Sequence, residues 1–246
     1  MSSLSKSRAI VLHYTKYGDS GAVLHVVDSL SGRQSLFVRG IGTSRRSSAL
    51  AAFHNLNVLD IVTVDTPHGS MATLKESTPI FQLDGIRSDI CRRTVALFVS
   101  EVIYRSLRAD DGDSALFAWL VESVVRLDSY DGPTANFHLW FLVGYSIRCG
   151  FRPQDTWDGE SAPIFDIPSA RFIAPGPFHD SSLLFTAQES ELLHRLLNCS
   201  FEEAMAIQLP SSRRLSFARK MLRYLSCHFG CTLDIRSLDV LHDIFA

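Results

Sequence analysis

The first third of the chain has the alternating pattern of short β-strands. Five segments rich in β-branched and aromatic residues fit this pattern: 8–17, 22–28, 34–39, 56–64 and 71–75. In the third segment, Leu36 and Val38 fall on one face and Phe37 and Arg39 on the other. Glycine-containing turns separate the first three segments. Five short strands with tight early hairpins and one longer connection predict a small closed barrel.

After Pro79 the hydrophobic positions recur every three or four residues, which is the spacing of amphipathic helices. Helices are predicted over 88–108, 114–128, 134–149 and 211–229. A further helix begins at the capping box formed by Thr186 and Glu189, and Gly230 ends the last long helix. The chain is therefore predicted to be an α+β protein, with strands first and helices later.

Residues 151–185 interrupt the helical pattern because they hold five of the nine prolines. Extended pieces are expected at 164–167 and 171–173. We therefore expect three parts: a barrel domain at 1–80, a helical bundle made of 81–150 and 186–246, and a small irregular, proline-rich insert at 151–185.

Charge follows the same division of the chain. The first 46 residues carry seven basic and two acidic residues, a net of +5, while the remaining 200 carry a net of −7. The near-neutral total of −2 conceals this polarity. A small basic lobe rich in strands, placed before an acidic helical body, predicts a module that binds a polyanion.

Cysteine and histidine usage argues against a disulfide framework or a metal site. The five cysteines are odd in number and thinly spread, and we expect them to be buried structural thiols. Cys227 and Cys231 lack a second Cys/His pair at zinc-finger spacing. The nine histidines are expected to be single structural or surface imidazoles. No metal and no cofactor is predicted.

No apolar run approaches the roughly 20 residues that span a bilayer. The first residues run directly into a strand pattern and lack the apolar stretch of a signal peptide. The cytoplasm is therefore the expected compartment.

One motif suggests a serine hydrolase, with Ser20 of Gly18-Asp19-Ser20 as nucleophile and His242 of an Asp-x-x-His segment as base. Such esterases need alternating strands and helices, which this chain lacks. Gly-Asp-Ser-Gly between two strands is also typical of a hairpin turn. No glycine-rich phosphate loop is present. We predict a turn, no catalytic residue and no enzymatic activity.

The basic residues of the predicted barrel are the candidate DNA-binding site. They are Lys16, Arg33, Arg39, Arg45 and Arg46. Binding to a nucleic-acid backbone needs several cations on one surface, because each phosphate contact releases counterions. Three aromatic residues lie nearby in the sequence: Tyr14, Tyr17 and Phe37. We expect them in the core, since large apolar side chains are mostly buried; stacking on bases is the alternative.

A second basic stripe lies on the helix predicted at 211–229. It consists of Arg213, Arg219, Lys220 and Arg223, which fall within about 120° of one another beside the apolar stripe. A solvated face beside a buried one is the expected role. The functional alternative is an extension of the DNA path or a binding site for an acidic partner.

An ordered set of short motifs resembles the bacterial RecO family of recombination mediators, in its Bacteroidetes-like branch. The motifs are Arg8 to Leu12, Tyr17 to Ser20, Gly32 and Arg33, Val38 to Gly40 with the basic loop that follows, Leu97 to Tyr104, Asn136 to His138, Gly150 to Pro153, and Arg236 to Leu241. Each motif is weak by itself, but their order and spacing are fairly specific, and together they cover essentially the whole chain.

The resemblance implies an N-terminal OB-fold barrel, a helical bundle and a small inserted module. Many members of the family hold zinc in that module through four cysteines. Residues 152–198 of this chain contain no cysteine, so no zinc is expected. Packing must then hold the insert, and four phenylalanines are candidates for it: Phe165, Phe172, Phe178 and Phe185.

The resemblance also implies a non-enzymatic role at the nucleoid. Proteins like RecO bind single- and double-stranded DNA, anneal complementary strands and, with RecR, help load the recombinase RecA. They also displace the single-stranded-DNA-binding protein, whose acidic, hydrophobic C-terminal tail would meet the basic stripe at 213–223. The barrel arginines would contact DNA or RecR. The alternative is a protein-binding adaptor whose barrel does not contact DNA.

Overall fold

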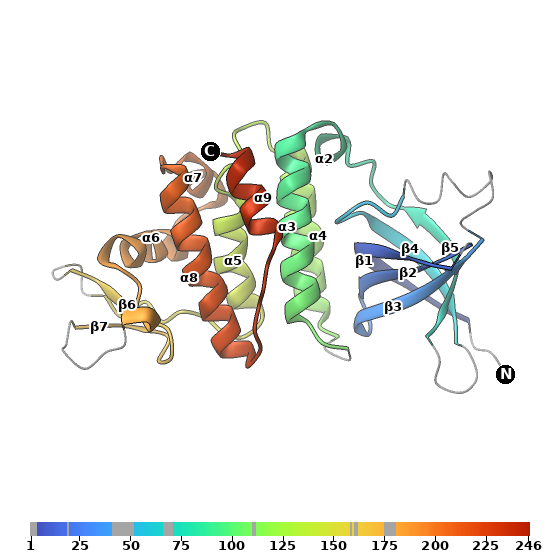
Figure 1. The fold of residues 1–246 in the computed structure, drawn as a ribbon, viewed down its shortest axis with the longest axis horizontal. Coiled ribbons are helices and arrows are strands. Elements are labelled where there is room, and N and C mark those ends of the chain that lie inside the picture. Colours follow the sequence, from blue (N-terminus) through green and yellow to red (C-terminus); the bar gives the residue numbers. More distant parts are fainter. Residues whose placement is uncertain are drawn as a thin grey trace. The chain divides into compact units, whose positions relative to one another are not determined.

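The computed structural model of the chain describes residues 4–18, 20–40, 52–65, 71–109, 112–157, 159, 162–174 and 181–246. These residues form two compact units, 1–129 and 130–246. The first unit contains a barrel and three helices, and the second contains a small hairpin and the remaining helices (Figure 1).

Five strands form the barrel of the first unit. They are β1 (Leu4–Tyr17), β2 (Gly21–Asp28), β3 (Gly32–Arg39), β4 (Val58–Val64) and β5 (Thr73–Pro79). The order around the barrel is β1-β2-β3-β5-β4. The long strand β1 closes it, because its first half pairs with β4 and its second half pairs with β2. This architecture confirms the predicted OB-fold barrel.

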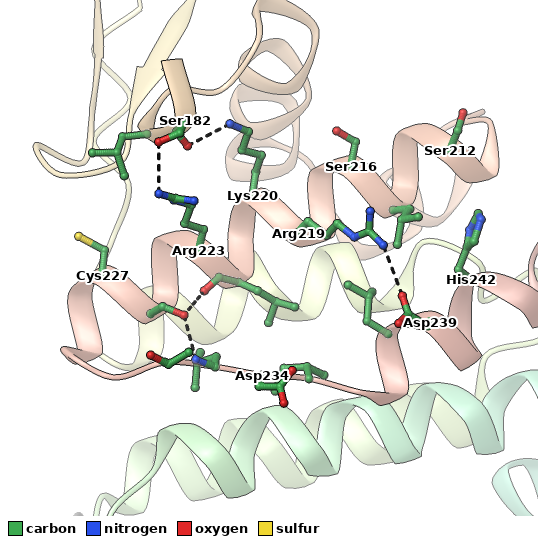
Figure 2. A pocket seen from close by; sticks show the side chains of 18 residues that line it. Ser182, Ser212, Ser216, Arg219, Lys220, Arg223, Cys227, Asp234, Asp239 and His242 are labelled. Atoms are coloured by element: carbon green, nitrogen blue, oxygen red, sulfur yellow. Dashed lines mark hydrogen bonds and ion pairs between the residues drawn. The ribbon is translucent and has the colours of Figure 1, made fainter. Parts of the chain in front are cut away.

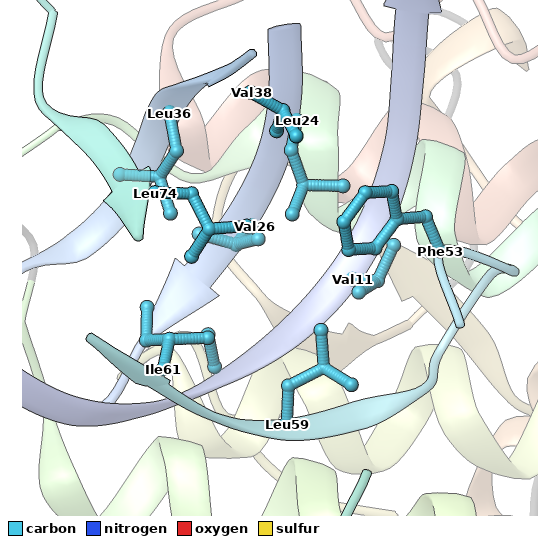
Figure 3. Packing of buried hydrophobic residues seen from close by; sticks show 10 residues of the cluster. Val11, Leu24, Val26, Leu36, Val38, Phe53, Leu59, Ile61 and Leu74 are labelled. Atoms are coloured by element: carbon cyan, nitrogen blue, oxygen red, sulfur yellow. The ribbon is translucent and has the colours of Figure 1, made fainter. Parts of the chain in front are cut away.

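Alternate apolar residues of the strands fill the barrel (Figure 3). Val11, Leu24, Leu36 and Leu59 point inward and are fully buried. Burying one such side chain contributes about 1.5–3 kcal/mol relative to leaving it in water. Phe53, from the segment before β4, packs into the same cluster. The apolar residues that alternate along the strands in the sequence are therefore the ones that form the barrel core.

Several strand boundaries differ from the prediction. Strand β1 begins at Leu4 instead of residue 8, and β3 begins at Gly32 instead of residue 34. Strand β4 begins at Val58 instead of residue 56, because Leu56 adopts a left-handed backbone with φ of 64°. Strand β5 spans Thr73–Pro79 instead of ending at residue 75. Pro79 pairs with Leu59 at the end of the strand, a position that tolerates the missing N–H of proline.

The helices of the first unit are α2 (Asp84–Ser88), α3 (Ile90–Ser106) and α4 (Ser114–Ser129). The predicted helix at 88–108 begins later than expected because Asp89 is extended and caps α3. Its carboxylate accepts hydrogen bonds from the backbone N–H groups of Cys91 and Arg92. Helix α3 packs against β1 and so places its side chains beside the outer face of the barrel.

The second unit is built around α5 (Phe137–Arg148), which packs against α6 (Ala187–Asn198), α7 (Phe201–Ala206) and α8 (Ser211–Phe229). Helix α9 (Ser237–Ile244) follows α8. The predicted capping box is present, with Thr186 and Glu189 bonded to each other's backbone. Gly230 ends α8 with a φ of 63°, as predicted.

Residues of the predicted insert form the antiparallel hairpin of β6 (Ile164–Asp166) and β7 (Arg171–Ile173), followed by the 3-10 helix η1 (Ser181–Leu183). The ring of buried Phe165 lies 5.3 Å from those of Phe172 and Phe185. These three phenylalanines form the expected packed cluster, and Phe178 lies outside the described residues.

The insert is also tied to α6 by polar side chains. Nδ1 of His194 lies 2.7 Å from the Asp155 carboxylate, which also accepts a hydrogen bond from Asn198. Among the described residues, no three His, Cys, Asp or Glu side chains gather as metal ligands. Residues 152–198 contain no cysteine, so they do not fit a four-cysteine zinc site.

Candidate nucleic-acid interface and partner groove

The pairing of β1, β2 and β3 determines which side chains share the outer face of the barrel. Between β2 and β3, Arg33 pairs with Val27, Phe37 pairs with Val23, and Arg39 pairs with Gly21. Arg33, Phe37 and Arg39 are separated by even numbers of positions along β3. Residues directly opposite each other share a face, and alternate residues of one strand do too. Arg33 and Arg39 therefore lie on one face, and Phe37 lies between them.

The other predicted DNA-binding residues have different positions. Lys16 is exposed and pairs with Ala22, so it lies on the opposite side of the β1–β2 ladder from Arg39. Arg45 and Arg46 lie outside the described residues. Of the five predicted cations, the structure thus brings Arg33 and Arg39 together on the outer face of the three strands.

Both arginines of this face lie over aromatic rings. The guanidinium carbon of Arg33 is 4.9 Å from the ring centre of Tyr104 on α3, and that of Arg39 is 5.8 Å from the ring centre of Phe37. The backbone N–H of Arg33 also donates to the carbonyl of Arg108. A ring contact uses the face of a guanidinium, whereas its N–H donors point outward in the plane.

The aromatic residues correct one expectation. Tyr14 and Tyr17 are exposed rather than buried in the core, and the exposed fraction of Tyr17 reaches 65%. They lie among the last four residues of β1, before the turn at Gly18. The ring of Tyr17 meets Phe37 edge-on, with centroids 5.8 Å apart. Gly21 lacks a side chain where Phe37 comes close, since a Cβ there would lie 3.1 Å from that ring.

Two histidines lie on the same face, between the two arginines. The rings of His13 and His25 stack with centroids 4.4 Å apart, and Tyr104 meets His13 edge-on at 4.3 Å. Nδ1 of His25 lies 2.9 Å from the Ser35 hydroxyl. The prediction of single imidazoles is wrong here. The hairpin pattern of the sequence could have predicted the stacked pair, because the two histidines are equally distant from the turn between β1 and β2.

Burial and neighbouring cations keep this histidine pair neutral. Burial, then the charge of Arg33, lowers the pKa of His13 below its usual 6.5. Burial, His13 and Arg33 together lower the pKa of His25 to about 4. At pH 7 the outer face therefore presents two arginine cations and a row of neutral rings.

A separate groove of about 1040 Å³ lies in the second unit (Figure 2). Its sides come from α8, from η1 and from α9 with the segment that precedes α9. Buried apolar side chains line it, among them Leu222, Leu233, Ile235 and Leu238. An apolar lining of this kind suits an apolar side chain of a peptide or partner.

Three of the four predicted cations of the second stripe line this groove. Arg219 lies 3.4 Å from the Asp239 carboxylate of α9. Nζ of Lys220 donates to the carbonyl of Ser182, and Arg223 donates to the hydroxyl of the same serine (Figure 2). Nζ of Lys220 also donates to the carbonyl of Leu184.

The fourth cation of that stripe, Arg213, is exposed near the start of α8 and lies outside the set of lining residues. The groove therefore combines an apolar lining with a basic side formed by α8.

The Asn136–His138 motif is structural. Nδ2 of buried Asn136 donates to the carbonyls of Ala204 and Ile207 at the end of α7. His138 is buried, and its burial, with the nearby charge of Arg214, lowers its pKa to about 3.

The serine-hydrolase motif falls in a hairpin. Gly18 has a φ of 62°, and Tyr17 pairs with Gly21 across the turn, as predicted; Asp19 lies outside the described residues. None of the helices in the described parts of the chain has the length and apolarity needed to cross a membrane.

Two family models match consecutive parts of the chain. The N-terminal model of recombination protein O matches residues 1–83, and its C-terminal model matches residues 87–234. The chain is 28% identical to the DNA repair protein RecO of Flavobacterium psychrophilum over 98% of its own length and 99% of that protein. It is 29% identical to the RecO protein of Porphyromonas gingivalis over 97% of its own length and 98% of that protein.

The RecO protein of Bacteroides fragilis is 28% identical over 98% of this chain and 99% of its own length. Family matches to both halves, alignments along nearly the full length and a five-stranded barrel followed by helices agree with one another. The chain belongs to the recombination protein O family, a family of recombination mediators that acts in DNA repair.

Proposed function

We propose that this protein is a DNA-binding recombination mediator that holds DNA on the outer face of β1, β2 and β3. The observation that carries the proposal is the placement of Arg33 and Arg39 on one face, with Phe37 between them. Cations attract the phosphate backbone, and exposed rings such as Tyr17 stack on bases of any sequence.

The histidine pair supports this use of the face. His13 and His25 are neutral rings at pH 7, so they add aromatic surface without adding charge. Arg33 and Arg39 then supply the attraction to phosphate. The proposed DNA contacts also include Lys16, Arg45 and Arg46. Lys16 would contact a DNA strand that runs along the edge of the β1–β2 ladder.

In this proposal the protein anneals single strands and, with RecR, helps load recombinase onto strands covered by the single-stranded-DNA-binding protein. It acts in the cytoplasm, at the nucleoid, without a catalytic step or a cofactor. Binding to a backbone through cations and rings suits annealing, because such contacts leave the hydrogen-bonding edges of the bases accessible.

The groove beside α8 is the proposed site for the acidic tail of the single-stranded-DNA-binding protein. The tail combines carboxylates with apolar residues, and the groove combines a basic side with an apolar lining. Arg219, Lys220 and Arg223 would meet the carboxylates, while the lining near Leu222 and Leu238 would take the apolar end. Arg213 would add attraction from outside the groove.

The test is an equilibrium titration of the full chain with a labelled single-stranded oligonucleotide from 50 to 200 mM salt. Binding through phosphate contacts should weaken by about tenfold or more over that range. An affinity that does not change with salt, or no binding at all, would favour the alternative of a protein-binding adaptor.

A further inference from the structure

The ion pair between Arg219 and Asp239 spans the groove beside α8 (Figure 2). Arg219 comes from α8 and Asp239 from the first turn of α9. Both side chains are strongly exposed, 61% for the arginine and 77% for the aspartate. An exposed ion pair of this kind contributes little to stability and exchanges readily with water or another ion.

Lys220, a second cation of the groove, is held more firmly. Nζ of Lys220 lies 2.6 Å from the carbonyl oxygen of Leu184 and 3.3 Å from that of Ser182. Arg223 donates to the Ser182 hydroxyl at 3.2 Å. Withdrawing Lys220 would remove a charged donor from two backbone acceptors, which costs more than separating an exposed ion pair. Arg219 is therefore better able than Lys220 to exchange its partner, and that partner is a carboxylate, the group that an acidic peptide would bring.

We infer that Asp239 is an internal competitor that occupies Arg219 until an acidic peptide displaces it. The inference rests on the proposed use of the groove as a site for an acidic, apolar peptide. Asp239 opposes such a ligand in two ways: it holds the arginine that the ligand's carboxylate needs, and its own charge repels that carboxylate. It thereby sets the affinity of the groove and favours ligands with several carboxylates.

A second aspartate provides a matched control. Asp234 also lines the groove, and its partner is Arg236 at 3.8 Å, with side chains 68% and 83% exposed. Neutralising Asp234 changes the net charge by the same amount as neutralising Asp239. It leaves the cation of α8 paired as before, so it separates the local competition from the general effect of charge.

The experiment compares the full-length protein with its Asp239→Asn and Asp234→Asn variants. The probe is a fluorescent synthetic peptide with consecutive aspartates followed by apolar residues at its C-terminus, and fluorescence anisotropy gives its dissociation constant. Asp239→Asn should tighten binding about three- to tenfold at low salt, whereas Asp234→Asn should change it less than about twofold. The gain should shrink as salt rises.

The outcomes distinguish the inference from the function on which it rests. Suppose that the peptide binds the unmodified protein, that Arg219→Ala weakens this binding, and that Asp239→Asn leaves it unchanged. The role of Asp239 as a competitor would then be wrong, while the groove would still be a peptide-binding site. If the peptide binds neither the unmodified protein nor Asp239→Asn, both are wrong. Binding that is detectable only after Asp239→Asn supports both. Thermal unfolding of each variant shows that α9 remains folded.

Discussion

The two basic surfaces of this protein differ in what their cations already contact. On the barrel, Arg33 and Arg39 lie over the rings of Tyr104 and Phe37. In the groove, Lys220 and Arg219 bind oxygen atoms of the chain itself. A ring contact uses the face of a guanidinium rather than its N–H donors. An oxygen contact uses the donors themselves, so a ligand must displace it.

Two basic patches that look alike in the sequence therefore form different surfaces, one with cations over aromatic rings and one with cations bound to oxygen atoms. We propose that the barrel face binds a polyanion, because Arg33, Arg39 and their neighbouring rings lie along one side of three paired strands. We propose that the groove exchanges partners, because Arg219, an exposed cation of its lining, has an exposed carboxylate partner. We therefore expect the barrel face to govern DNA affinity and the groove to govern the affinity for an acidic peptide.

The largest expected effect is a loss of stability in the second unit, which contains the groove but not the barrel. Phe165→Ala removes a fully buried ring that packs on Phe172 and Phe185 in the second unit. It should lower the free energy of unfolding by about 3–5 kcal/mol, measured by urea denaturation. Peptide binding should fall as well, because η1 forms one side of the groove. DNA binding at low temperature should persist.

Ile244→Ala is the matched control, because Ile244 is exposed on α9 and should cost less than about 1 kcal/mol. If Phe165→Ala abolished DNA binding while the barrel stayed folded, the two surfaces would not be independent.

Acid should destabilise the second unit through a buried histidine. The pKa of His138 is about 3 in the folded protein, against 6.5 as its usual value. Below pH 6.5 the unfolded chain takes up a proton that the folded chain does not. The contribution of neutral, buried His138 to the free energy of unfolding is therefore fully present above pH 6.5, and it is lost as the pH falls toward 3. From pH 6.5 to 5 the loss should be about 2 kcal/mol.

Urea denaturation at pH 7 and pH 5 measures this loss. His138→Phe should flatten the pH dependence even if it lowers stability at pH 7. His25, with a pKa of about 4, should act in the same direction for the first unit. A protein that became more stable between pH 6.5 and 5 would contradict this assignment.

The smallest expected effect concerns one ring of the barrel face. Tyr17→Ala should weaken binding of a single-stranded oligonucleotide by about five- to tenfold, because a base loses its stacking partner. Tyr14 is a matched control, since it is exposed on the same strand but lies on the opposite side of the ladder. Equal losses for Tyr17→Ala and Tyr14→Ala in anisotropy titrations would show that the DNA does not select this face.

Local signals in the sequence predicted most of the fold. Period-2 and helical spacing indicated the five strands and the long helices, and the Thr186 capping box and Gly230 marked helix ends. These features depend on neighbours within a few residues. The starts of β4 and α3 were less predictable, because they depend on the left-handed Leu56 and on the cap at Asp89.

The candidate sites were only partly predictable, because they depend on contacts between distant segments. The stripe on α8 was visible in the sequence, but the contact of Lys220 with Leu184 joins residues 36 positions apart. The position of Arg33 over Tyr104 likewise joins a strand to a helix. The stacked pair of His13 and His25 was within reach, since the turn at Gly18 sets the register that brings them together.

The most direct test of the central claim compares two double variants of the full-length protein in DNA binding. Arg33→Ala with Arg39→Ala removes the cations of the barrel face, and Arg219→Ala with Arg223→Ala removes the same charge from the groove. We predict that the barrel pair weakens binding of a single-stranded oligonucleotide by roughly 10- to 100-fold, whereas the groove pair changes it less than about twofold. The reverse result, with both variants folded, would contradict the assignment of DNA to the barrel face.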